Sequence, residues 1–128
     1  MKYVLLLQNA QEDRDRWATL SEEQAKAERA AEIPKWNALF EEMMAGGHWL
    51  DGQELDDPAS AKTLRIRDGE RLVTDGPYAE TKEQVGGFFL IEAEDLDQAI
   101  GIAAKVPVAE RASVEIRPLA ESSQEPAG

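Results

Sequence analysis

The chain has 128 residues, a common size for a single domain, and 42% of them are hydrophobic, which argues against wholesale disorder. It contains no cysteine, which excludes disulfide bonds, thiolate nucleophiles and cysteine metal sites. Its formal net charge of −12 disfavours nucleic acid and membrane surfaces as partners, and no basic patch overrides this charge. No apolar run approaches the roughly 20 residues of a membrane span, and the apolar start is too short for a signal peptide. We therefore expect a cytoplasmic protein.

The first half of the chain predicts a strand, a long helix and a second strand. Residues 2–8 are short and apolar, which is typical of a buried strand, and a polar stretch follows them. Ser21 and Gln24 have the spacing of a capping box, which predicts the start of a helix. We expect Gly46-Gly47 to end this helix, and residues 48–55 to form the second strand.

Apolar residues recur along this helix at helical spacing, so one side of it should face a core. These residues are Ile33, Trp36, Phe40, Met43 and Met44. Pro34 should kink the helix or start a second one, because its ring and its missing N–H disturb the preceding turn.

A β-hairpin is predicted in the middle of the chain. Asp68-Gly69 joins two alternating segments, residues 63–67 and 70–74, and a two-residue Asp-Gly loop is a strong hairpin signal. The register that this turn sets places Leu64 opposite Val73, a favourable apolar pair.

The last third of the chain predicts a strand, a helix and a strand. Residues 88–93 (FFLIEA) are too apolar for an edge strand and predict a central one. Asp95 can cap the helix that follows, and residues 113–119 predict the last strand. The apolar side of that helix comprises Leu96, Ala99, Ile100, Ala103 and Ala104.

Without the hairpin, the predicted order is βαββαβ, that of a ferredoxin-like α+β fold with an inserted β-hairpin. Residues 1–119 form one predicted domain, and residues 120–128 are a polar tail that need not fold. Helices cover one face of such a sheet and leave the other face bare. We therefore expect a homodimer in which the bare faces pack together.

The stretch DGPYAETKEQVGG, residues 75–87, differs from an ordinary loop. Asp75-Gly76 repeats the Asp-Gly of the hairpin, but Pro77 should push Gly76 toward extended conformations and away from left-handed geometry. The chain should then not fold straight back at Gly76. Pro77 also fixes its own φ, and we expect a stiff corner that presents Asp75 and Tyr78.

The run LVTDGPYAETKEQVGGFFLIEAEDLDQAI resembles the YCII-related family, in the subgroup named for a DGPF motif, with Tyr78 in place of the usual Phe. The similarity extends from KYVLLL to VEIRPL and implies a ferredoxin-like fold assembled as a dimeric α/β barrel. Some relatives are proposed enzymes with a His–Asp pair whose histidine lies on the first long helix. Here the single histidine, His48, follows Gly46-Gly47, so that chemistry is not carried over. Members of the subgroup often accompany extracytoplasmic-function sigma factors, which suggests a regulatory link.

The candidate site residues belong to this motif, and each has a structural alternative. Asp75 is a candidate acid/base catalyst, or it caps the local turn. Tyr78 would bond a ligand or serve as a packing ring, and the charged run after it is either ligand-binding or solvated. The candidate ligand-binding residues are Tyr78, Thr81, Lys82, Glu83, Gly86 and Gly87, and the structural ones are Gly76 and Pro77.

A metal site at His48, Asp51 and Glu54 is disfavoured, because Asp51 would point to the other face of a strand from His48 and Glu54. We expect no metal and no cofactor. The leading hypothesis is a small-molecule site in a cleft formed on dimerisation, with residues 75–87 as one wall; whether a reaction occurs there is left open. The alternative is a non-catalytic regulatory protein that contacts a partner such as a sigma factor, and a third is a scaffold without ligand.

Overall fold

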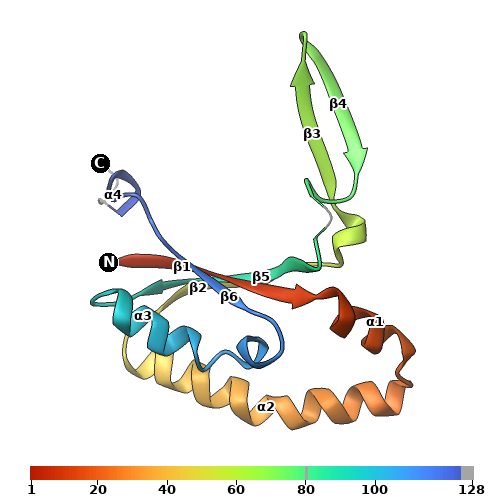
Figure 1. Cartoon of the computed structure of the whole chain (residues 1–128). Coiled ribbons are helices and arrows are strands. Elements are labelled where there is room, and N and C mark those ends of the chain that lie inside the picture. The colour runs from red at the N-terminus through yellow and green to blue at the C-terminus, as the bar shows by residue number, and fades with distance from the viewer. Residues whose placement is uncertain (80, 125–128) are drawn as a thin grey trace.

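The computed structural model describes residues 1–79 and 81–124 and shows an α+β fold (Figure 1). In chain order the elements are β1 (Lys2–Ala10), α1 (Gln11–Thr19), α2 (Glu22–Ala45), β2 (Trp49–Glu54), β3 (Lys62–Arg67), β4 (Glu70–Asp75), β5 (Glu83–Glu92), α3 (Leu96–Ala103), β6 (Val114–Pro118) and α4 (Glu121–Gln124). Two 3₁₀ turns, η1 (Pro58–Ser60) and η2 (Pro107–Glu110), lie between them. Of the expected tail, residues 121–124 form α4, and residues 125–128 lie outside the described residues.

The main sheet is antiparallel and has the strand order β2-β5-β1-β6. The strand predicted from FFLIEA is therefore central, as expected, and begins earlier, at Glu83. Successive side chains of each strand point to opposite faces of the sheet. One face of the sheet therefore packs against α2 and α3, which Figure 1 shows on the same side. Tyr3, Leu5, Phe89 and Ile91 form the buried row of this face.

The polar stretch after β1 folds as α1, which the sequence did not predict. This helix buries no residue, and no side chain caps its start. Apolar periodicity, the main signal for a helix, is therefore missing. Ion pairs of Asp13 and Arg16 with other elements hold α1 in place instead.

The capping box that begins α2 is present. The Ser21 hydroxyl accepts from the backbone N–H of Gln24 at 3.1 Å, and the Gln24 side chain accepts from the N–H of Ser21 at 3.0 Å. We expect Ser21→Ala to lower the free energy of unfolding by about 1 kcal/mol, because the N–H of Gln24 loses its side-chain acceptor. Urea denaturation measures this loss, and an unchanged midpoint would contradict it.

Helix α2 runs through Pro34 without a break, so the expectation of a second helix there is wrong; Figure 1 shows that the helix bends along its length. The packing of its buried side, with Leu39 and Met43 at the centre, offsets the hydrogen bond lost at Pro34. The predicted stripe also needs correction, because Ile33 and Met44 at its margins are exposed. Helix α2 ends at Gly46-Gly47 as expected, with Gly47 at φ +71°.

Helix α3 begins at Asp95, whose carboxylate accepts from the N–H of Gln98 at 2.9 Å, as predicted. Its buried side is narrower than the sequence suggested. Leu96 and Ile100 are exposed, whereas Ile102 is buried.

Strands β3 and β4 form a separate two-stranded sheet, which we call the arm (residues 62–75). The turn has positive φ at both Asp68 (52°) and Gly69 (76°), as a type I′ turn requires. The predicted pair Leu64–Val73 is confirmed. Figure 1 shows the arm rising from the main sheet on the side opposite to α2 and α3.

The conformation of Gly76 differs from the expectation, since its φ is +91°. The ring of Pro77 disfavours the α region for the preceding residue, but glycine has no Cβ and adopts positive φ at little cost. The chain does leave the hairpin here, as predicted, and continues into β5 of the main sheet.

Candidate functional site

The corner formed by residues 75–78 lies at the base of the arm and faces solvent. The Asp75 carboxylate pairs with Lys62 across the arm, and its side chain is 86% exposed. The Tyr78 ring is 80% exposed and has the guanidinium carbon of Arg65 at 5.2 Å from its centroid. The turn-capping role expected of Asp75 has no hydrogen bond among the described residues. Neither Asp75 nor Tyr78 lines either of the two cavities described below.

Thr81, Lys82 and Glu83 line an open, polar hollow of about 420 Å³ at the start of β5. The Ser113 hydroxyl donates to the Glu83 carboxylate at 3.0 Å, and the Thr81 hydroxyl donates to the Glu83 carbonyl. The Lys82 carbonyl accepts from the N–H of Gln11 at 2.5 Å. These contacts fasten the start of β5 to the first residue of α1 and to the residue that precedes β6. Glu80 of the same motif lies outside the described residues.

A larger cavity, of about 600 Å³, lies between α2 and the main sheet. Its apolar wall is an aromatic cluster of four rings: Trp36 and Phe40 from α2, Trp49 from β2, and Phe89 from β5. Ring centroids within the cluster lie 5.1–6.2 Å apart, mostly edge to face, which is the favoured arrangement for aromatic pairs. The sequence predicted Trp36 and Phe40 as core residues, and they do pack against the core.

Three glycines allow close packing in the wall of this cavity. A Cβ at Gly52 would lie 2.4 Å from Cη2 of Trp49, and one at Gly86 would lie 2.1 Å from Nδ2 of Asn9. A Cβ at Gly87 would lie 3.0 Å from the backbone oxygen of Gln53. Gly86 and Gly87 are the two candidate ligand-binding residues that line this cavity, while the other four candidates lie outside it.

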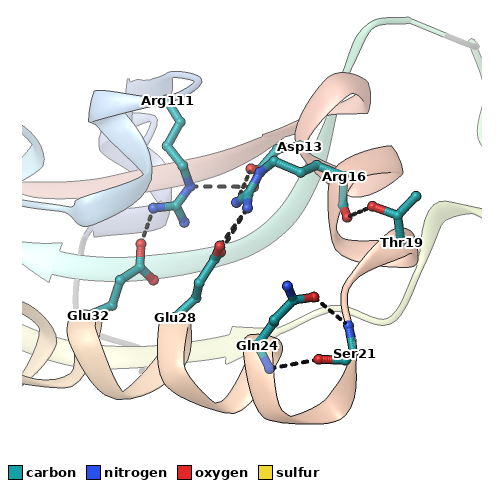
Figure 2. A network of polar contacts seen from close by, with 8 residues as sticks. All are labelled: Asp13, Arg16, Thr19, Ser21, Gln24, Glu28, Glu32 and Arg111. Atoms are coloured by element: carbon teal, nitrogen blue, oxygen red, sulfur yellow. Dashed lines mark hydrogen bonds and ion pairs between the residues drawn. The ribbon is translucent and has the colours of Figure 1, made fainter.

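A polar network beside the cavity joins α1, α2 and the segment that follows η2 (Figure 2). Arg111, which follows η2, pairs with Glu32 of α2 and with Asp13 of α1, the latter at 3.4 Å. Arg16 of α1 pairs with Asp13 at 3.0 Å and with Glu28 of α2 at 2.8 Å. Hydrogen bonds to Glu28 first, and to Asp13 next, raise the pKa of Arg16 above its ordinary value. The network fixes Glu32 and Arg111, both of which line the cavity.

Arg29 is the second arginine of the lining and has a different environment. Its guanidinium carbon lies 5.3 Å from the centroid of the Trp17 ring, a cation–π contact. Within residues 1–79 and 81–124, no carboxylate pairs with it, whereas Asp13 and Glu32 neutralise Arg111. The hydrogen-bond donors of Arg29 are therefore not engaged by a described carboxylate.

Aromatic walls and one available guanidinium suit the binding of a flat, apolar body that has an anionic group. The sequence could not indicate this site. Helical spacing predicts that one side of α2 is buried, but not that the space facing it is partly empty.

His48 has a structural role. Its Nδ1 lies 2.8 Å from the carbonyl oxygen of Glu92, and its backbone N–H donates to the Met43 carbonyl. Among the described side chains, no group of three or more His, Asp or Glu is placed to hold a metal ion. Over the same residues, none of the helices combines the length and the apolarity that crossing a membrane demands.

Comparison with known proteins places the chain in a family. The model of the YCII-related domain matches residues 1–123, nearly the whole chain. An uncharacterized protein of Rhizobium meliloti (strain 1021) is 49% identical over 63 residues, which are 48% of this chain and 51% of that protein. The chain thus spans about half the length of this curated relative. On the strength of the domain match, the chain belongs to the YCII-related domain family.

Proposed function

We propose that the protein binds a small, flat, mostly apolar molecule with an anionic group in the cavity between α2 and the main sheet. The aromatic cluster is the observation that carries this proposal. The cavity volume of about 600 Å³ lies within the range of roughly 300–1,000 Å³ typical of ligand sites. Apolar walls with a few polar groups are also typical of such sites.

Arg29 is the residue that selects for the anion. A guanidinium presents two parallel N–H donors that match a carboxylate. The Trp17 ring packs against the Arg29 side chain but carries no negative charge that would neutralise it. Arg111 would hold the shape of the cavity instead, because its charge is already balanced by Glu32 and Asp13.

Titration calorimetry with 2-naphthoate, a planar aromatic carboxylate, tests both parts of this proposal. We expect Arg29→Gln to weaken binding by about tenfold or more, equivalent to about 1.4 kcal/mol, and Arg29→Lys to restore part of the loss. Lys26→Gln is the matched control, because it removes the same charge from an exposed position of the same helix. The naphthalene cation 2-naphthylmethylammonium should bind more weakly than the anion.

Two results would contradict the proposal. Equal affinities of wild type and Arg29→Gln, or tighter binding of the cation, would exclude the anion preference. If Asp75→Asn abolished binding and Arg29→Gln did not, the ligand site would lie at the 75–78 corner. The acid/base role of Asp75 stays a prediction, as does catalysis itself.

We also propose that the protein is a ferredoxin-like domain that forms a homodimer through the bare face of its sheet. The strand order β2-β5-β1-β6, with α2 and α3 on one face, supports the first part. The second part is supported by half-buried apolar side chains at the centre of the other face: Val4, Leu6, Phe88 and Leu90.

Three further parts of the interpretation stay proposals. Membership of the DGPF subgroup is supported by the run from Asp75 to Tyr78. A cytoplasmic location and a regulatory link to a sigma factor are supported by the composition and by the resemblance. Pull-down from native cell extract at low salt tests the regulatory link, and recovery of the homodimer alone would count against it.

A further inference from the structure

The arm exposes apolar side chains that a free hairpin would not be expected to expose. Leu64, Ile66 and Val73 are 57%, 54% and 62% exposed. The register places all three on one face of the arm, which we call the outer face, whereas Arg65 and Leu72 lie on the opposite face. Two-stranded hairpins are marginally stable alone in water, so a covering surface for this face is favoured.

The arm has a fixed base. The N–H of Gly76 donates to the Ala61 carbonyl at 2.7 Å, and the Thr63 hydroxyl donates to the Gly76 carbonyl at 2.9 Å. On the face opposite the outer one, the guanidinium of Arg65 contacts the ring of Tyr78. These contacts set the direction in which the arm leaves the sheet, away from α2 and α3 (Figure 1).

That direction brings the arm beside any protein that sits on the bare face of the sheet. A second copy that packs there would have the arm of the first copy along its flank. The two-fold symmetry of a homodimer would place the second arm equivalently on the first copy.

The charge distribution also favours a second copy of the chain as the protein that covers the outer face of the arm. The arm, residues 62–75, has four cations and three anions, whereas the rest of the chain has ten cations and 23 anions. A slightly basic arm is therefore complementary to the strongly acidic body of another copy.

We propose that the outer face of the arm docks on the partner copy in the homodimer, so that the arm of each chain contacts the other chain. This inference rests on the proposed dimer and extends it to a second contact area. The arm supplies Leu64, Ile66 and Val73 as anchors. Arg71, which lies opposite Ile66 on the same outer face, meets the acidic surface of the partner.

Sedimentation equilibrium of the full chain tests the docking. The double variant Leu64→Thr/Val73→Thr places β-branched threonine, which suits a strand, at both positions and removes apolar surface from the outer face. We expect its dimer dissociation constant to rise at least about tenfold, because buried apolar area is lost from the contact. Leu72→Thr, on the opposite face of the arm, is the matched control and should change the constant less than about threefold. Circular dichroism confirms that all variants are folded.

The outcomes separate the arm from the dimer. A wild-type dimer that the double variant leaves intact, but that Phe88→Glu dissociates, would overturn arm docking and preserve the sheet-to-sheet dimer. A wild-type chain that stays monomeric at all accessible concentrations would overturn both arm docking and the sheet-to-sheet dimer. A different protein would then have to cover the outer face. Binding of 2-naphthoate, measured in the same variants, reports on the cavity independently.

Discussion

Replacement of Phe89 by alanine should lower the free energy of unfolding by about 3–5 kcal/mol. The ring is 7% exposed and contacts Trp36, Phe40 and Trp49, with centroids at 6.2, 5.7 and 5.1 Å. Its removal takes apolar area from the core and enlarges a space that the chain already leaves partly empty. Equilibrium denaturation in urea measures the loss.

Phe88→Ala is the matched control, because it deletes the same ring from the preceding residue of β5, which points to the other face of the sheet. We expect a clearly smaller loss for a single chain, since this ring is only half-buried. Both variants should be compared at one low protein concentration, because dimerisation makes apparent stability depend on concentration. Equal losses for the two variants would contradict the assignment of the helix-covered face as the core.

The second large effect is expected at Gly52, where alanine should cost about 1–3 kcal/mol of stability. The new Cβ would lie 2.4 Å from Cη2 of Trp49, 2.8 Å from Cδ1 of Phe89 and 2.9 Å from the backbone oxygen of Phe88. The rings must move, and the backbone oxygen limits how far the strand can yield. Because both rings line the cavity, affinity for 2-naphthoate should fall as well.

Gly101→Ala is the control for this substitution. It lies in α3 with no atom within 4 Å of an added Cβ. Alanine should there raise stability by about 0.5–1 kcal/mol, since glycine costs that much within a helix. A thermal melt that ranks the two variants in the opposite order would show that the cavity wall is not tightly packed at Gly52.

The features that the sequence predicted well depend on neighbours in the chain. The arm follows from the Asp68-Gly69 turn, because two residues with positive φ set both the turn type and the register. The start of α2 follows from the reciprocal bonds of Ser21 and Gln24, which lie three residues apart. Such signals depend on residues that are close in sequence, so the packing of distant segments does not change them.

The features that the sequence did not predict depend on distant partners. Helix α1 has no apolar stripe and is held by ion pairs to α2 and Arg111. Pro34 does not break α2, because packing against the sheet offsets its local cost. At Gly76, the freedom of glycine to adopt positive φ outweighed the restriction expected from Pro77.

The candidate site likewise combines features that depend on neighbouring residues with features that depend on distant ones. The sequence indicated a corner at residues 75–78, and a corner exists there, but its exposure and the pairing of Asp75 with Lys62 depend on the arm. The proposed ligand cavity arises where α2, β2 and β5 meet, and its residues come from segments far apart in the chain. Among the described residues of the motif, Gly86 and Gly87 are the two that also line the cavity.

An NMR titration with 2-naphthoate, followed through the backbone amide signals of the glycines, tests the proposed ligand site most directly. Glycines sample both candidate locations: Gly52, Gly86 and Gly87 line the cavity, while Gly69 and Gly76 lie at the tip and base of the arm. We predict saturable shifts of the first three signals, with those of Gly69 and Gly76 unchanged. A saturable shift of Gly76 with Gly52 and Gly87 unmoved would place the ligand at the 75–78 corner and contradict the cavity as the binding site.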